Sequence, residues 1–216
     1  MNILRGFSYY RPQPGDIVCV EDGTIGDLAY HIFAPPTRIS HVAIITGLVR
    51  DLADYEIAES IPNGGVRIGR LSWYRDRHYK IYRLNDPEAR SMGFRVAALK
   101  SIYGRTGYDF QLYLLLAIDI PLTLLKILWR EHRLRRIRPS ELHILRNRAM
   151  VCTEFVNELY RICGRPLIPD GVPALPAGYQ LAINDQKLEL IHIHRPEQKR
   201  HWLPRRSLVK APAYRR

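Results

Sequence analysis

Cys152 is the residue whose type and position best suit nucleophilic chemistry. It stands in the first turn of a helix predicted over residues 151–163. Unpaired backbone N–H groups and the positive end of the helix dipole favour a thiolate there. The alternative is an inert buried cysteine, because free cysteines are among the most buried residues. Cys19, inside an apolar strand, and Cys163, at the far end of the helix, are interpreted as structural.

A nucleophilic cysteine needs a base, and His41 is the strongest candidate. It begins a strongly apolar strand, a rigid mount for an imidazole, although a histidine that only forms a hydrogen bond at a strand end is an equal alternative. The base in turn needs a polar orienting group. A hairpin centred near residue 50 would place Glu59 opposite His41, whereas Glu56 would point to the other face. The sequence therefore predicts that Cys152, His41 and Glu59 meet.

The elements that must position these residues are short strands and one amphipathic helix. Turn residues separate the apolar runs, which predicts an antiparallel sheet. Gly164-Arg165-Pro166 is a helix stop signal and ends the helix that begins near Cys152. The predicted strands lie at 17–20, 40–47, 55–60, 66–68, 79–84 and 188–194.

The composition is that of a globular chain with a sizeable core. Of 216 residues, 46% are hydrophobic and 25% charged, which excludes collagen, coiled coils and wholly disordered chains. Lysine and arginine number 33 against 21 acidic residues, a formal net charge of +12. This balance predicts attraction to polyanions but does not choose among anionic membranes, nucleic acid and acidic polymers.

Five groups of residues, in this order, resemble the motifs of one known family. They are Gly15-Asp16-Ile17-Val18; Ser40-His41-Val42-Ala43-Ile44; Ala58-Glu59-Ser60 with Gly65-Val66-Arg67; Tyr103-Gly104 with Tyr108-Asp109-Phe110; and Cys152-Thr153-Glu154-Phe155-Val156. The family is the permuted NlpC/P60 group of papain-like cysteine hydrolases, in its YiiX/YaeF-like branch, akin to the lecithin:retinol acyltransferase relatives. Its histidine precedes its cysteine, as here. The resemblance covers roughly residues 12–194.

The resemblance implies an α+β, circularly permuted papain-like (NlpC/P60) fold, with an antiparallel sheet packed against the cysteine-bearing helix. It implies a cysteine hydrolase or acyltransferase with Cys152 as nucleophile, His41 as base and Glu59 as the polar third member. An amide or ester bond would be cleaved through a thioester. The Cys152 N–H is a candidate oxyanion donor, and Tyr108 is either a further donor or a packed core tyrosine.

The chain is interpreted as one catalytic domain with an insertion. The domain covers residues 1–194, the apolar and basic insertion lies at about 111–148, and residues 195–216 form a basic tail expected to be partly disordered. No cofactor is predicted. No metal is predicted either, although His192 and His194 share a strand face, because no acidic or cysteine cluster accompanies them.

The apolar run at residues 112–129, which an arginine-rich block follows, has three interpretations. A membrane span is disfavoured by Asp119 and Pro121 near its middle. A buried helical pair broken at Pro121 is the second. The third is an interfacial element whose arginines favour anionic headgroups, so that residues 112–138 bind an anionic membrane without spanning it.

The partner predicted from the sequence is a peptide, cell-wall stem, acyl or lipid substrate. Nucleic acid is disfavoured because no recognised binding motif is present. Residues 1–10 lack the apolar core of a signal peptide, and the three cysteines have no disulfide-framework spacing. The expected location is cytoplasmic, with attachment to a membrane surface as the alternative, and the oligomeric state stays open. The competing function is an inactive module of the same fold that binds membranes or polyanions.

Overall fold

The computed structural model describes residues 11–196 except 22, 63–64, 87, 89–109, 143–150 and 171. The predicted helix at 151–163 is present as α4, with bounds that differ by one residue at each end. The elements are β1 (Ile17–Val20), α1 (Gly23–Ile32), β2 (His41–Val49), η1 (Arg50–Leu52), β3 (Asp54–Ile61), β4 (Gly65–Arg70), η2 (Leu71–Tyr74), β5 (Tyr79–Leu84), α3 (Phe110–Glu131), η3 (Pro139–Glu141), α4 (Cys152–Ile162), α5 (Pro176–Asn184) and β6 (Leu188–His194).

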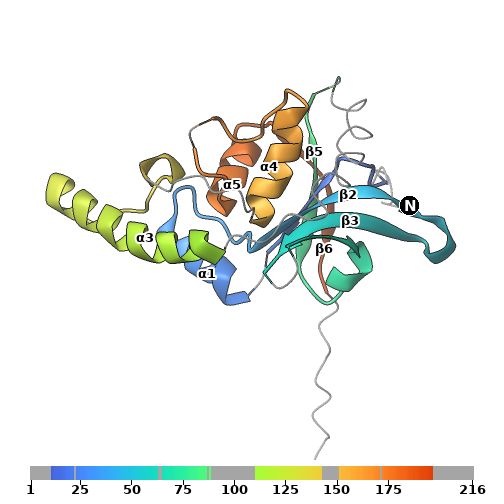
Figure 1. Ribbon diagram of the computed structural model, residues 1–216, viewed down its shortest axis with the longest axis horizontal. Helices are drawn as coiled ribbons and strands as arrows, with labels where there is room; N and C mark the ends of the chain where they lie inside the picture. Colours follow the sequence, from blue (N-terminus) through green and yellow to red (C-terminus); the bar gives the residue numbers. More distant parts are fainter. Residues whose placement is uncertain are drawn as a thin grey trace, which may run out of the picture.

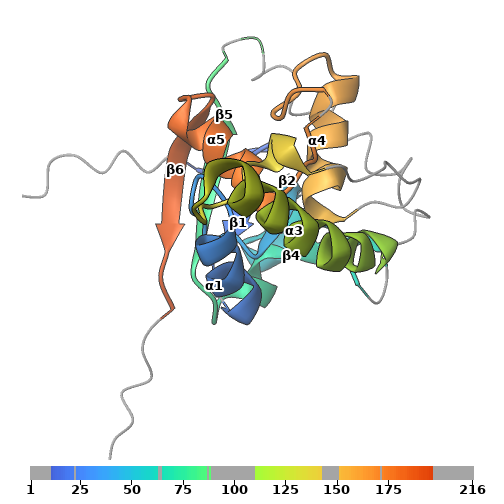
Figure 2. The ribbon, with the colours of Figure 1, turned by 90° about the vertical axis from the view of Figure 1, so that its left-hand side faces the viewer.

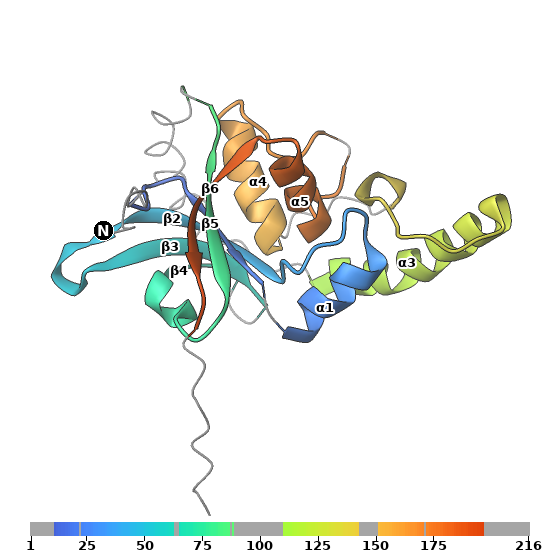
Figure 3. The same cartoon turned by 180° about the vertical axis from the view of Figure 1, so that it is seen from behind.

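Six strands form one antiparallel sheet in the order β4-β3-β2-β1-β5-β6. The predicted α+β class is therefore confirmed for the described residues, and β1, β5 and β6 have the predicted bounds. Figures 1 and 3 show α4 and α5 side by side along one face of this sheet, while α3 extends away from the sheet beyond α1.

The two faces of the sheet are buried against different elements. Side chains along a strand point alternately to the two faces of the sheet. Val42 and Ile44 therefore face Phe155 of α4 and Tyr179 of α5, whereas Ala43 and Ile45 face the opposite side. There the short η2 turn covers the sheet with Leu71 and Tyr74, which are both buried. Burial on both faces explains why β1 and β2 are almost continuously apolar.

The register between β2 and β3 differs from the predicted one. Glu59 pairs with Ala43 rather than with His41, because the connection includes η1 and Ala53 (φ 48°) and is not centred on residue 50. The connection shifts the pairing by three residues, and a β-bulge at Thr46 then shifts it back by one. The total offset from the predicted pairing is two residues, which leaves His41 and Glu59 on the same face of the sheet.

Helix α3 runs unbroken for 22 residues, with Pro121 inside it. The interpretation of this run as a helical pair broken at Pro121 is therefore wrong. A proline removes one backbone hydrogen bond, at a cost of about 3 kcal/mol, which packing can offset. Ile120, Leu124 and Ile127 pack at helical spacing into a small core with Phe33 and neighbouring residues. Among the described residues, none of the helices has the length and apolarity that crossing a membrane requires.

Asn157 fixes the chain that leaves α4. Its side-chain oxygen accepts hydrogen bonds from the backbone N–H groups of Leu167 and Ile168, at 3.1 and 2.9 Å. All three residues are buried. Tyr179 of α5 adds a hydroxyl hydrogen bond of 2.9 Å to the Thr153 carbonyl. The helix that carries Cys152 is thus held near its start and at its middle by buried polar contacts.

We predict that Asn157→Leu lowers the free energy of unfolding by about 2–4 kcal/mol, because it leaves two buried N–H donors without a partner. Urea denaturation measures the loss. Asn184→Leu is the matched control, since Asn184 is exposed near the end of α5 and bonds only Gln180 among the contacts described. A loss below about 0.5 kcal/mol for Asn157→Leu would contradict the role assigned to this side chain.

Candidate active site

Cys152 is the first residue of α4, as predicted. The preceding residue, Val151, is extended (φ −75°, ψ 166°), so the chain turns into the helix at the cysteine itself. The sulfur accepts hydrogen bonds from the backbone N–H groups of Thr153 and Val42. These donors come from the helix start and from β2, so the thiol is held where helix and sheet meet. Only 6% of Cys152 is exposed.

His41 begins β2 and lies between Cys152 and Glu59. Its Nε2 atom is 2.7 Å from Oε2 of Glu59. Its side chain is also hydrogen-bonded to Cys152, and Nδ1 is the nitrogen that remains for that contact. The Tyr74 ring stacks on the imidazole, with centroids 5.8 Å apart and planes at 22°. The ring is therefore fixed from both nitrogens and from one side.

Glu59 is completely buried and makes several charged or polar contacts. Besides His41, its Oε2 accepts a hydrogen bond from the Tyr74 hydroxyl. Its Oε1 is 2.9 Å from Nε and 2.8 Å from Nη2 of Arg67, which lies directly opposite it on β4. A buried carboxylate is costly unless it is paired, and these partners satisfy both oxygens.

Arg67 and Gly69 complete the surroundings of the carboxylate. The Arg67 guanidinium lies 4.9 Å from the centroid of the Trp73 ring, a cation–π contact. A Cβ at Gly69 would come within 2.7 Å of the same ring and 3.3 Å of Glu59 Oε1. Only glycine allows this strand to pass so close to both groups.

The electrostatics favour a charged Cys152–His41 pair. Burial acts to raise the pKa of Cys152, but the His41 imidazolium and the hydrogen bonds to the sulfur outweigh it and lower that pKa. Burial acts to lower the pKa of His41, but the Cys152 thiolate and hydrogen bonds to Cys152 and Glu59 raise it to about 10. For Glu59, hydrogen bonds from His41 and Tyr74 outweigh burial and lower the pKa to about 2.

Charge therefore alternates along the chain of contacts: thiolate, imidazolium, carboxylate, guanidinium. In this state the sulfur is a nucleophile and the imidazolium holds a proton that it can give up. Such an arrangement can attack an electrophilic carbon and protonate the group that departs.

The structure brings Cys152, His41 and Glu59 together, as the sequence predicts. The carboxylate that contacts His41 is that of Glu59, whereas Glu56 accepts a 2.7 Å hydrogen bond from Thr46. Tyr108 lies outside the described residues.

Among the other cysteines, Cys19 is fully buried, which raises its pKa, and Cys163 is partly exposed at the end of α4.

Arg67 and Tyr74 were not recognised as site residues from the sequence. Arg67 could have been found, because the connection between β3 and β4 is short and places it opposite Glu59, and cross-strand pairs of opposite charge are favourable. No pattern in the sequence singles out Tyr74, which reaches the site only because η2 folds back over the sheet.

Neither a protein-family model nor a curated protein matches the sequence. Among solved structures, the chain is similar to the crystal structure of metalloprotein yiiX from Escherichia coli O157:H7. The TM-score is 0.52 and the identity 13%, over 87% of this chain and 100% of that one. At this identity the likeness concerns the fold.

The residues around Cys152 do not fit a metal ion. The Glu59 carboxylate is occupied by an arginine, a tyrosine and a histidine, which leaves no oxygen free for a cation. The described ranges contain no group of three or more histidine, cysteine or acidic residues suited to hold one. His192 and His194 instead lie near the Tyr79 ring.

What the comparison supports is an α+β fold shared with yiiX, on which this chain carries a buried cysteine–histidine–glutamate arrangement.

Proposed function

We propose that the protein is a cysteine-dependent hydrolase or acyltransferase that cleaves an amide or ester bond through a thioester on Cys152. The observation that carries the proposal is the continuous set of contacts from the Cys152 sulfur through His41 to Glu59. The shifts in pKa favour the protonation states that acyl transfer needs: the pKa of Cys152 is lowered, that of His41 is raised to about 10 and that of Glu59 is lowered to about 2.

In the proposed reaction the Cys152 thiolate attacks the substrate carbonyl and forms a carbon–sulfur bond. The backbone N–H groups at the start of α4 are suited to hold the developing oxyanion. His41 then donates its proton to the amine or alcohol that leaves, which breaks the amide or ester bond. Neutral His41 next takes a proton from water or another acceptor, whose oxygen or nitrogen attacks the thioester and releases the acyl group and the thiolate.

Glu59 acts in this proposal as a positioning residue. Its bond to Nε2 of His41 fixes the tautomer and the ring orientation, and its charge stabilises the imidazolium. Arg67 and Tyr74 in turn hold the carboxylate.

We further infer that the chain is a permuted NlpC/P60-like hydrolase of the YiiX/YaeF branch. The likeness to yiiX supports the fold, and the order of His41 before Cys152 supports the permutation. The substrate class proposed is a peptide, a cell-wall stem, or an acylated or lipid molecule.

The reaction is tested by trapping the thioester. Purified protein is mixed with p-nitrophenyl acyl esters and with acyl amides, and intact mass is recorded after acid quench. The expected result is an acyl adduct on Cys152 that is absent in Cys152→Ala and slow to form in His41→Ala. Binding of acyl substrates by the wild type without any adduct or turnover would favour the alternative function, an inactive binding module of this fold.

We predict that Cys152 reacts with iodoacetamide faster than Cys163 although Cys163 is the more exposed. At pH 6 an ordinary thiol of pKa 9.0 is only about 0.1% thiolate, whereas the lowered pKa of Cys152 keeps a larger fraction reactive. The selectivity should therefore be greatest at low pH and fade as pH rises toward 9. Peptide mass spectrometry after brief labelling measures the three cysteines separately.

His41→Ala is the control for this labelling. Without the imidazolium, the pKa of Cys152 should rise toward the ordinary thiol value of 9.0. Labelling of Cys152 at pH 6 should then fall at least tenfold. Equal labelling of Cys152 in wild type and His41→Ala would show that the histidine does not activate the thiol.

We predict that Glu59→Gln destabilises the protein by about 3 kcal/mol at pH 7, because His41 and Arg67 lose the fully buried carboxylate that pairs with both of them. The pKa of Glu59 is lowered from 4.5 to about 2, so its contribution is present above about pH 4.5 and lost as pH falls through 2. The difference in unfolding free energy between wild type and variant should therefore shrink below pH 4.5. A difference that does not change between pH 7 and pH 3 would contradict the charged role of Glu59.

A further inference from the structure

Helix α3 has two apolar faces, and the described residues cover one of them. Ile120, Leu124 and Ile127 pack into the small core beside α1 and η3. On the opposite side, Ile118, Leu122, Leu125 and Trp129 follow one another at spacings of four, three and four residues, which places them on a single line along the helix. We call these four residues the outer stripe.

The outer stripe is strongly exposed. Its members are 54%, 50%, 61% and 83% accessible in chain order, and the adjacent Leu128 is 42% accessible. A helix that is apolar all round is normally buried. Contiguous exposed apolar surface marks a site of interaction. Figure 2, which looks at the molecule from the side of α1 and α3, shows α3 lying across the front of the fold.

Two cations flank the outer stripe. Lys126 and Arg130 are one turn apart and both exposed, and each lies next in sequence to a stripe residue. The only acid on that flank, Asp119, accepts a 3.4 Å hydrogen bond from the Thr123 hydroxyl and is half-buried. The edge of the stripe is therefore basic.

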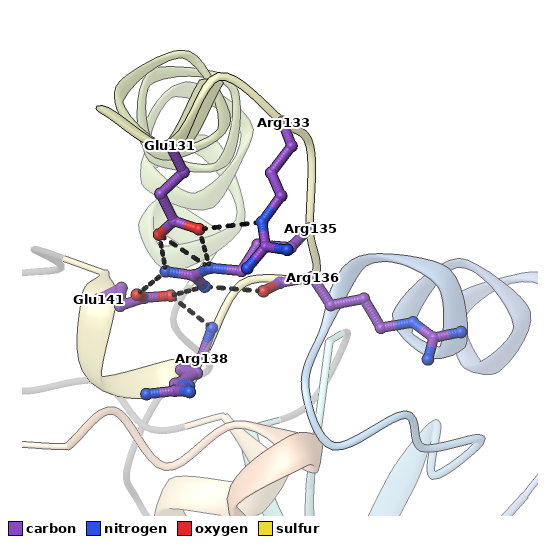
Figure 4. Close-up of polar contacts among 6 residues, drawn as sticks. All are labelled: Glu131, Arg133, Arg135, Arg136, Arg138 and Glu141. Atoms are coloured by element: carbon purple, nitrogen blue, oxygen red, sulfur yellow. Dashed lines mark hydrogen bonds and ion pairs between the residues drawn. The ribbon is translucent and has the colours of Figure 1, made fainter. Parts of the chain in front are cut away.

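The arginines that follow α3 serve a different purpose. Figure 4 shows Arg135 held between Glu131 and Glu141, at 2.8 and 2.6 Å. Arg136 points away from this cluster, and its guanidinium lies 5.3 Å from the centroid of the Tyr30 ring on α1. These contacts tie the segment after α3 to the fold, so this part of the arginine block is structural. Lys126 and Arg130 remain as the cations beside the apolar surface.

We propose that the outer stripe is a docking surface for an anionic lipid bilayer, with α3 lying flat in the headgroup region. The apolar line enters the boundary with the acyl chains, and Lys126 and Arg130 contact lipid phosphates. Trp129, the most exposed member, has the amphipathic ring that favours the membrane interface. The proposal does not depend on the activity of Cys152.

The charges argue against a second copy of the chain as the occupant. Two stripes packed face to face would bring Lys126 and Arg130 of both copies together, in a protein whose net charge is +12. Like charges at such an interface are repulsive, whereas an anionic bilayer is complementary to them.

The test is co-sedimentation of the full-length protein with vesicles of phosphatidylcholine alone and of phosphatidylcholine with one-third phosphatidylserine. We expect binding to the anionic vesicles at low salt, at least tenfold weaker binding to the neutral ones, and weakening as salt screens the charges. Leu122→Ser/Leu125→Ser and Lys126→Glu/Arg130→Glu should each reduce binding to the anionic vesicles at least tenfold. Cys152→Ala should bind like the wild type, which separates this result from the proposed reaction.

Matched controls keep the test specific. Leu48→Ser/Leu52→Ser removes two leucines of similar exposure at the β2–β3 connection, 56% and 53%, and Arg70→Glu/Arg75→Glu reverses two exposed charges near η2. Both pairs should bind like the wild type. Brominated lipids give an independent readout: they should quench tryptophan fluorescence in the wild type and quench it less in Trp129→Phe.

Three results would overturn the proposal. One is the absence of binding to anionic vesicles at low salt. Another is binding that neither α3 pair weakens, which would place the contact elsewhere on the chain. The third is a dimer in sedimentation velocity that Leu122→Ser/Leu125→Ser dissociates, which would make a second copy the occupant.

Discussion

The buried carboxylate of Glu59 is the constraint on which the candidate site depends. A charge with no exposed surface must be matched nearby, and here it is matched by His41, Arg67 and the hydroxyl of Tyr74. Each partner comes from a different part of the fold: the start of β2, the neighbouring strand β4 and the η2 turn. Gly69 is small because the same carboxylate and Trp73 crowd it. Satisfying this one group therefore requires the sheet register and the position of η2 to be correct together.

The bulge at Thr46 decides which face of the sheet Glu59 occupies. Between the bulge and the β2–β3 connection, the numbers of two paired residues add up to 103, as for Leu48 and Tyr55. Before the bulge they sum to 102, as in Ala43 with Glu59. Without the extra residue Glu59 would oppose Ile44 and point toward α4, away from the side of Ala43 and His41. The bulge thus moves the Glu59 side chain from one face of the sheet to the other.

Much of the site could be predicted from the sequence because it depends on local signals. The helix start at Cys152, the apolar strand after His41 and the bounds of β1, β5 and β6 follow from turn residues and alternation, and the structure contains them. The choice of Glu59 over Glu56 rested on face parity, and the contact is present although the assumed pairing was two residues off. Helices α1 and α5 and the role of Tyr74 were not predicted, since they are determined by packing between distant segments. The interpretation with a break at Pro121 fails for the same reason: the cost of a proline inside a helix is visible in the sequence, but the core that offsets this cost is not.

Two buried cysteines show how far environment outweighs burial. Cys19 and Cys152 are both enclosed, and burial raises the pKa of each. Burial and the negative charge of Glu21 both raise the pKa of Cys19, so its thiol stays protonated. Cys152 has an imidazolium whose charge is itself sustained by Glu59, together with two backbone N–H donors, and its pKa falls. The reactivity proposed for Cys152 is therefore a property of the whole set of contacts. Arg67 and Tyr74 both contact the buried carboxylate of Glu59. A substitution at either residue would therefore change the pKa of Cys152 indirectly, through Glu59 and His41.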